Sequence, residues 1–481
     1  MKDLADLALD CLDVPGVDYG DIRIVEQMRE NIATRNGVVE ALASSQSLGF
    51  GIRVLYQGCW GFASSNDLSR KKIKEIAQKV IKIAQASSMI SGEKVILTKA
   101  PIVKNGRYET PIKKNPFEIS LNEKIKLLLG ADKTMRRVKK ITVAQAFFQA
   151  FQENKVFAST EGNSFKQKII TTGAGIQALA TDGKDAQIRS YPNSFRGQFR
   201  TAGFESVEGL DLVSHAPQIA EEAVALLTAK QCPQGEFDVI LDGPQLALQV
   251  HESCGHPVEL DRVLGYEASF AGTSFMTLDQ LGKLKYGSKI VNITADADTP
   301  GGLGTFGFDD EGIPGQRTPI IKNGIHVGYL TSRETSFVLN QKSNGTMRAD
   351  SWLVSPLIRM TNINLEAGEW DLDDLIADTK NGILMSVNKS WSIDDKRINF
   401  QFGCEVGWEI KNGKRDRMFK NPTYTGITPK FWQSCDAICN KKYWQVWGTP
   451  NCGKGEPMQR MYVGHGTAPA RFRKVKVGLW K

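Results

Sequence analysis

The chain has 481 residues, of which 41% are hydrophobic and 24% are charged. A chain of this length and composition can bury a substantial core, which excludes the fibrous and the extensively disordered classes of protein. The formal net charge of +8 is modest for this length, so it permits an acidic partner without requiring one.

The N-terminal segment and the cysteines indicate a cytoplasmic protein. Asp3, Asp6 and Asp10 fall within the first ten residues, which lack the apolar core and cleavage pattern of a signal peptide. No window approaches the roughly 18 uninterrupted apolar residues of a membrane span. The eight cysteines are too sparse for a secreted disulfide framework. Because the basic stretches lack interleaved aromatic residues, we expect neither nucleic acid nor a membrane as a partner.

Residues 1–215 have the pattern of an α+β domain. Alternating apolar residues predict antiparallel strands, and Asn36-Gly37 predicts a hairpin turn because both residues tolerate a positive φ. Ser69 caps an amphipathic helix, and a second helix is predicted to begin at Asn115-Pro116. The helices are therefore expected between two groups of antiparallel strands.

The second half reads as a β-rich domain. A helix that begins near Ala216 is followed by turn residues, so residues 216–235 are predicted to be a helix and linker and residues 236–481 a separate domain. Hairpins are predicted at Asn323-Gly324 and Asn412-Gly413. We expect a large barrel or sandwich with few helices.

The segment HESCGH places two of the five histidines, His251 and His256, five positions apart. A helix is predicted to begin at Pro244 and to end near His251. On an ideal α-helix a five-residue step separates two side chains by about 140°, too far for one metal ion. We therefore predict that the helix breaks, with Gly255 in the left-handed conformation and Pro257 biasing His256 away from the α region.

Glu252 is better placed to act on a metal-activated water than to bind the ion, because it projects differently from His251. An open catalytic zinc site still needs a third protein ligand. The spacing leaves several candidates open, namely Cys254, Glu259, Asp261, Cys452 and His465.

Two alternatives compete with a catalytic metal at this segment. The two histidines can simply finish a helix without binding anything. A structural zinc can instead use Cys435, Cys439, Cys452 and His465, although the second pair is spaced more widely than in usual zinc fingers.

Five blocks of the sequence, in order, resemble the TldD/PmbA family and specifically its metal-bearing TldD branch. The resemblance extends along most of the chain. It is carried by YGDIRIVEQMRENIATRNGVVEALASSQSLGFGIRVLYQGCWGFASSNDLS, HESCGHPVELDRVLGYEASFAGTSF, GTFGFDDEGIPGQRTPIIKNGIHVGYL, NGTMRADSWLVSPLIRMTN and NCGKGEPMQRMYVGHG.

This resemblance implies a zinc-dependent peptidase that acts on unfolded or extended peptides. It implies His251, His256 and Cys452 as the ligands of Zn²⁺ and Glu252 as the catalytic base. It further implies a dimer that encloses the site, typically a heterodimer with a PmbA-like subunit that lacks the histidines. A homodimer is the other arrangement we consider.

Three further residues, Asp309, Asp310 and Arg317, lie in a turn-rich segment and are weaker candidates for lining the substrate site; a solvated acidic turn explains them equally well. Two other functions remain open from the residues. One is a non-catalytic binding subunit that modulates a partner, with a structural metal or none. The other is a thiol hydrolase that uses Cys254.

Overall fold

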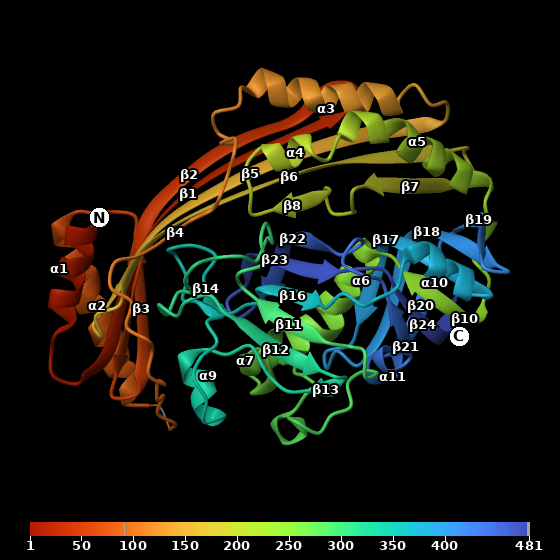
Figure 1. Cartoon of the computed structure of the whole chain (residues 1–481). Coiled ribbons are helices and arrows are strands. Elements are labelled where there is room, and N and C mark those ends of the chain that lie inside the picture. Colours follow the sequence, from red (N-terminus) through yellow and green to blue (C-terminus); the bar gives the residue numbers. More distant parts are fainter. Residues whose placement is uncertain (91, 479–481) are drawn as a thin grey trace.

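A curved sheet of long antiparallel strands dominates the first half and arches over the second half (Figure 1). The computed structural model describes residues 1–90 and 92–478. The sheet has the strand order β3-β2-β1-β5-β6-β4, and two short strands, β7 and β8, also pair with β6. Its strands are β1 (Val17–Arg35), β2 (Val38–Tyr56), β3 (Cys59–Ser65), β4 (Gly106–Glu109), β5 (Ile141–Ser159), β6 (Ser164–Thr181), β7 (Ala186–Tyr191) and β8 (Gln198–Arg200).

The first hairpin forms as predicted. Asn36 and Gly37 join β1 to β2 with φ values of 50° and 88°, the left-handed conformation that these two residues tolerate well. The flanking strands run for 19 residues each. They are far longer than a typical strand, so the sheet can span both halves of the molecule.

Helices cover the outer face of the arch, while its inner face turns toward the C-terminal half (Figure 1). On β5, Ala144, Ala146, Phe148 and Ala150 alternate with residues of the other face and pack in one cluster with the helices. On that other face, the amide of Gln149 donates to the Tyr462 hydroxyl. The covering helices are α3 (Leu121–Met135), α4 (Glu205–Glu208) and α5 (Leu212–Thr228).

Two more helices, α1 (Lys2–Leu12) and α2 (Arg70–Ser88), pack at the other end of the long strands. The predicted cap of α2 is confirmed, because the Ser69 hydroxyl accepts from the Lys72 N–H. The predicted start at Asn115-Pro116 is wrong: α3 begins at Leu121, after its cap Ser120, and the chain before it forms turns. Within the described residues, no helix combines the length and the apolar character needed to span a bilayer.

The C-terminal half contains a closed barrel, which confirms the predicted β-rich fold beside an α+β half. Strands follow the order β17-β10-β24-β20-β18, and pairing of β17 with β18 closes the ring. Both predicted hairpins, at Asn323-Gly324 and Asn412-Gly413, are confirmed. The barrel strands are β10 (Gly235–Leu241), β17 (Asn381–Ile393), β18 (Asn399–Lys411), β20 (Thr423–Ile427) and β24 (Ala470–Val477), and β9 (Lys230–Gln231), β19 (Lys414–Lys420) and β21 (Cys435–Ile438) extend the same sheet.

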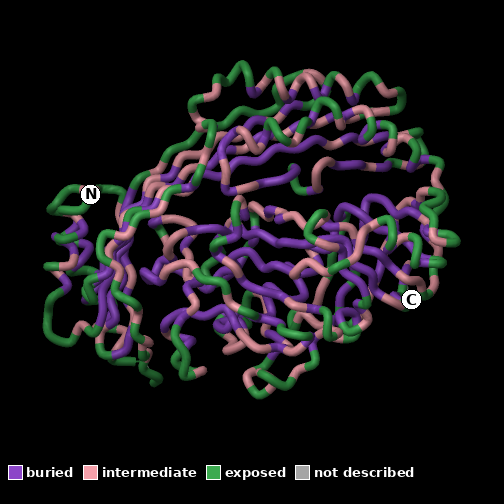
Figure 2. Tube along the Cα trace, viewed as in Figure 1, coloured by how far each residue is buried: buried purple, intermediate pink, exposed green. Residues whose placement is uncertain are grey.

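A six-stranded sheet lies beside the barrel, in the order β13-β12-β11-β16-β23-β22. Buried segments run along the long arch strands and through this half (Figure 2). The sheet consists of β11 (Ile293–Asp296), β12 (Arg317–Lys322), β13 (Ile325–His326), β16 (Asn362–Leu365), β22 (Gln445–Lys454) and β23 (Gln459–Thr467). Outside the sheets lie the short pair β14 (Met347–Arg348) and β15 (Leu357–Ile358) and the helices α6 (Gly243–Val250), α7 (Leu260–Val263), α8 (Ala268–Ala271), α9 (Arg333–Val338), α10 (Leu372–Asp378) and α11 (Thr428–Gln433).

Candidate metal centre

The HESCGH segment continues α6 as a π-helical turn. Asp242 caps α6 through the Gly243 N–H, and the helix runs to Val250. Residues His251–Gly255 then form a π-helix, in which the His256 N–H bonds back to the His251 carbonyl. An i→i+5 turn brings residues five apart to the same side, which an α-helix does not do. The five-residue spacing between the histidines is therefore matched to this turn.

The predicted interruption of the α-helix is confirmed, but the predicted cause is wrong. Gly255 and His256 both keep right-handed helical conformations, with φ values of −57° and −65°. The glycine is required by packing instead, because a Cβ at this position would lie 2.4 Å from the sulfur of Met360. Pro257 follows within a short 3-10 helix, His256–Val258.

The turn brings two imidazoles to the thiol of Cys452. One ligand atom from each of His251, His256 and Cys452 can be chosen so that all three lie within 4.8 Å of one another, and all three residues are buried. The Cys452 sulfur lies 3.7 Å from the Nε2 of His256. Two such atoms on one tetrahedral zinc ion would be about 3.5 Å apart, given the usual Zn–N and Zn–S distances. The donor set thus fits Zn²⁺ in both chemistry and spacing.

Each histidine is oriented by a second buried side chain. The Nδ1 of His251 lies 2.8 Å from the Nε2 of His465, and the Nδ1 of His256 lies 2.9 Å from a carboxylate oxygen of Glu259. The Nε2 atoms of both ligand candidates are thereby left for an ion. Such outer contacts fix the tautomer and the ring orientation of metal-binding histidines.

The partners of Glu259 extend this support. Lys454 pairs with Glu259 at 3.4 Å and with Asp261 at 2.7 Å. Three residues that the spacing left open as a third ligand, namely Glu259, Asp261 and His465, therefore lie one contact away from the donor cluster. The sequence signals the residues themselves but not this arrangement.

The ionisation of the cluster favours a bound cation. Burial raises the pKa of the Cys452 thiol, but His251, Arg359 and His256 together outweigh burial and hold that pKa well below its usual value. Burial lowers the pKa of His256 to about 3 and that of His465 well below its usual value. For His251 the charge and hydrogen bond of Cys452 outweigh burial and raise the pKa. A thiolate beside imidazole nitrogens is the protonation state that binds zinc.

Glu252 lines a cavity of about 260 Å³ together with all three donor residues. Its carboxylate binds Arg397, with an N···O distance of 2.5 Å. Burial raises the pKa of Glu252, but the charges of His251, His256 and Arg397 outweigh burial and lower it. Sequence reasoning missed Arg397, because it lies 145 positions from Glu252, in the turn between β17 and β18, and no local pattern links the two residues.

The alternative structural zinc site is not assembled. Cys435 and Cys439 belong to two separate apolar clusters, and across residues 1–90 and 92–478 the cluster at Cys452 is the one group of three or more donor side chains placed to share an ion. Cys254 lies in the core, and burial raises the pKa of its thiol to about 12. That environment disfavours Cys254 as a nucleophile.

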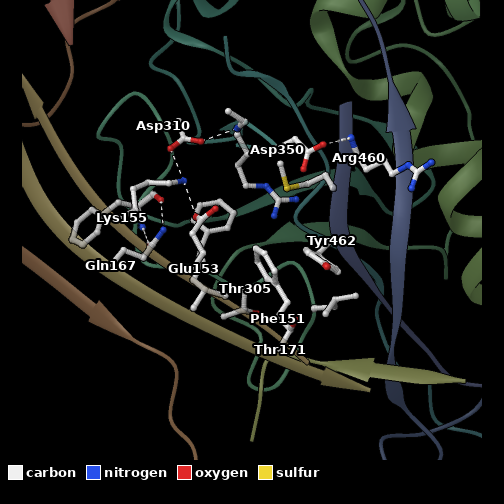
Figure 3. Close-up of a pocket in the computed structure, with 17 residues that line it drawn as sticks. Phe151, Glu153, Lys155, Gln167, Thr171, Thr305, Asp310, Asp350, Arg460 and Tyr462 are labelled. Atoms are coloured by element: carbon white, nitrogen blue, oxygen red, sulfur yellow. Dashed lines mark hydrogen bonds and ion pairs between the residues drawn. The ribbon is translucent and has the colours of Figure 1, made fainter. Parts of the chain in front are cut away.

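The three weaker site candidates lie outside the residues that line the metal-side cavity. Asp310 is buried 2.7 Å from Lys155, in another cavity between the arch and the C-terminal half (Figure 3). The Asp309 carboxylate accepts backbone N–H groups of its own loop and of Met347. Arg317 is exposed on β12 and pairs with Glu366. Their part in substrate binding stays a prediction.

Comparison with known families decides the relationship. The model of the PmbA/TldA metallopeptidase C-terminal domain matches residues 234–479, that of domain 1 matches residues 20–84, and that of the central domain matches residues 114–231. The chain belongs to this family. The resemblance that the five sequence blocks suggest, and the metalloprotease class that it implies, are therefore confirmed.

Individual relatives agree with this assignment. A metalloprotease from Methanocaldococcus jannaschii is 31% identical over 409 residues, covering 85% of this chain and 87% of its own. A zinc metalloprotease TldD homolog from Saccharolobus solfataricus is 22% identical, covering 96% and 97%. The crystal structure of TldE from Thermococcus kodakarensis superposes with a TM-score of 0.76 at 16% identity, covering all of both chains, and shows that the fold is shared.

Proposed function

We propose that this chain is a zinc-dependent peptidase that hydrolyses extended or unfolded peptides at the His251/His256/Cys452 centre. The observation that carries the proposal is the buried cluster of three zinc-type donors that shares a cavity with Glu252. A catalytic zinc site has three protein ligands and one open position, and this cluster has the first property and faces a cavity that allows the second. The zinc metalloprotease among the relatives supports the choice of metal.

Glu252 is the general base of the proposed reaction. When bound, zinc supplies Lewis acidity, which activates a water molecule and polarises the peptide carbonyl. Arg397 holds one carboxylate oxygen of Glu252. The other oxygen takes the proton from the attacking water and then delivers it to the nitrogen of the leaving amine.

The position of the cavity favours an extended substrate. Its lining residues come from the loop after β7, from α6, from β17 and from β22, so the arch and the C-terminal half both contribute. A single extended strand is far narrower than a folded domain. The enzyme therefore acts on unfolded chains, in which the peptide bond is accessible.

We further propose that the working enzyme is a cytoplasmic dimer. The partner is either a PmbA-like subunit without the metal-binding histidines or a second copy of this chain. Co-purification of the two gene products, followed by light scattering of each alone and of their mixture, distinguishes the two assemblies.

Metal content and hydrolysis test the proposal together. Elemental analysis should find near-stoichiometric zinc in the purified chain and none in a folded His251→Ala, His256→Ala variant. Glu252→Gln should keep the zinc while hydrolysis of an unfolded casein fragment falls by about 10²- to 10⁴-fold, the usual contribution of a general base. Zinc retained after loss of both histidines, or full activity of Glu252→Gln, would overturn the proposal. The activity assays are run with the partner subunit present.

A further inference from the structure

The metal-side cavity continues into a second cavity. This adjoining cavity measures about 460 Å³, and Phe195, Pro450 and Asn451 line both cavities. Asn451 directly precedes the candidate ligand Cys452. The two cavities therefore form one cleft that begins at the donor cluster and passes around the edge strand β22.

A strained turn shapes the junction of the two cavities. Phe195 and Arg196 both adopt left-handed backbone conformations, with φ values of 58° and 75°, which residues with a Cβ rarely do. The following Gly197 packs directly against β6, since a Cβ there would lie 2.0 Å from the carbonyl oxygen of Ala174. Strained conformations that packing enforces cluster at ligand sites. Here the strain presents both side chains to the cleft.

The metal-side cavity has apolar walls near the donor cluster. Phe195 and Trp391 meet edge to face, with their ring centroids 5.2 Å apart, and both are partly exposed, by 37% and 46%. Pro244, Leu248 and Trp447 complete the apolar lining. Exposed aromatic rings beside a cavity suit an apolar or aromatic side chain of a ligand.

The adjoining cavity carries unpaired positive charge. Arg29, Arg196 and Arg460 line it together with a single carboxylate, that of Asp350. Arg29 takes that carboxylate at 3.6 Å, whereas within residues 1–90 and 92–478 neither Arg196 nor Arg460 has an acidic side chain within ion-pair distance. Figure 3 shows Asp350 accepting from the backbone of Arg460 and Tyr462 on the same strand. Two guanidinium groups are thus available to a carboxylate.

The register of the β22–β23 hairpin sets the distance between the two parts of the cleft. Arg460 pairs with Gly453, the residue after Cys452. With strands about 4.8 Å apart and a rise of about 3.4 Å per residue, the Arg460 guanidinium can reach a point roughly 10 Å from the donor cluster. An extended peptide covers that distance in about two to four residues.

We propose that this cleft selects extended peptides that carry an apolar side chain at the donor cluster and an acidic side chain two to four residues away, bound by Arg196 and Arg460. This specificity deepens the proposed peptidase function and rests on it. The Phe195–Arg196 turn links the two contacts, because Phe195 bounds the apolar part and Arg196 lies in the basic part.

Peptide binding to the Glu252→Gln variant tests this specificity without hydrolysis. The probes are fluorescein-labelled dodecapeptides of Ala, Gly and Ser with one Phe, and with Glu, Gln or Lys two, three or four residues from it on either side. Fluorescence anisotropy should show that the best Glu peptide binds about tenfold more tightly than its Lys counterpart, as expected for a charge-assisted contact. Replacing Phe by Ser should weaken binding by a similar factor.

Charge reversal assigns the preference to the two arginines. Adding Arg196→Glu and Arg460→Glu should reverse the order, so that the Lys peptide binds better. Arg70→Glu and Arg137→Glu form the matched control, because both arginines are exposed and the change in net charge is the same. Equal binding of the Glu and Lys peptides, no measurable binding of any peptide, or reversal in the control would overturn the specificity. Hydrolysis of the Phe peptides by the unmodified protein, whatever its charge preference, separately tests the peptidase function.

Discussion

Two buried polar clusters of this protein differ in how their charges are satisfied. The ionic cluster joins the arch to the C-terminal half: Lys155 on β5 lies 2.7 Å from Asp310 and 3.0 Å from Glu153 (Figure 3), and Arg53 on β2 pairs with Asp21 and also donates to the carbonyl of Asp310. The donor cluster, formed by His251, His256 and Cys452, brings lone-pair atoms together instead.

The difference separates a structural cluster from a functional one. Buried ions are tolerated where opposite charges and hydrogen bonds satisfy them, as in the ionic cluster. No Lys or Arg side chain among the described residues bonds to the imidazoles or to the sulfur of the donor cluster, although Arg359 donates to the Cys452 carbonyl. A cation from solution therefore completes the donor cluster, whereas the ionic cluster needs none.

The comparison is broken most severely by removing a donor. Cys452→Ser should lower zinc affinity at least about a thousandfold, because one of three ligands contributes roughly a third of a binding free energy above 10 kcal/mol. Competition with a chromophoric chelator measures the affinity. The metal-free form should unfold at nearly the same urea concentration as the metal-free parent. A large loss of metal-free stability would show that Cys452 is mainly structural.

Removing a charge from the ionic cluster should have the opposite profile. Asp310→Asn leaves Lys155 without its nearest carboxylate partner and should lower the free energy of unfolding by about 3 kcal/mol, as expected for a broken buried pair. Urea denaturation measures this loss, and zinc affinity of the folded variant should be unchanged. If zinc affinity fell while stability held, the two clusters would not be separate.

A smaller effect is expected from the contact behind His251. His465→Gln should weaken zinc binding about 10- to 100-fold, because the bond that orients His251 is altered while the ligands stay. His326→Gln is the matched control, since His326 is also fully buried but bonds to the carbonyl of Gly328. Equal zinc affinities of the two variants would contradict an orienting role for His465.

The smallest expected effect concerns pH and a histidine outside both clusters. Burial lowers the pKa of His326 to about 4, so between pH 4 and 6.5 the unfolded chain binds a proton that the folded chain does not. This contribution to stability is complete above the unfolded pKa and is lost as the pH falls. From pH 7 to 5.5 the parent should lose about 1 kcal/mol more than His326→Gln. Urea denaturation at both pH values, without metal, measures the difference, and parallel losses would refute it.

Local signals in the sequence predicted the elements that depend on neighbouring residues. The Asn-Gly hairpins and the Ser69 cap are confirmed, because positive φ and an N-terminal hydroxyl are preferences of single residues. The pair His251 and His256 stood out for the same reason. The helix at Asn115 failed, because Ser120 provides a competing cap five residues later. The boundary predicted within residues 216–235 stays a prediction.

The sequence by itself determined the mixed fold, the hairpins and, through family resemblance, Cys452 as the partner of the two histidines. Only the tertiary structure decided how these donors meet. The π-turn depends on Met360, which packs where a side chain at Gly255 would lie, and Arg397 reaches Glu252 from 145 positions away. Contacts between distant segments leave no pattern in either segment, because each residue type is also common at positions without such a partner. The same holds for Arg196 and Arg460, which share a cleft only because β6 and the β22–β23 hairpin position them there.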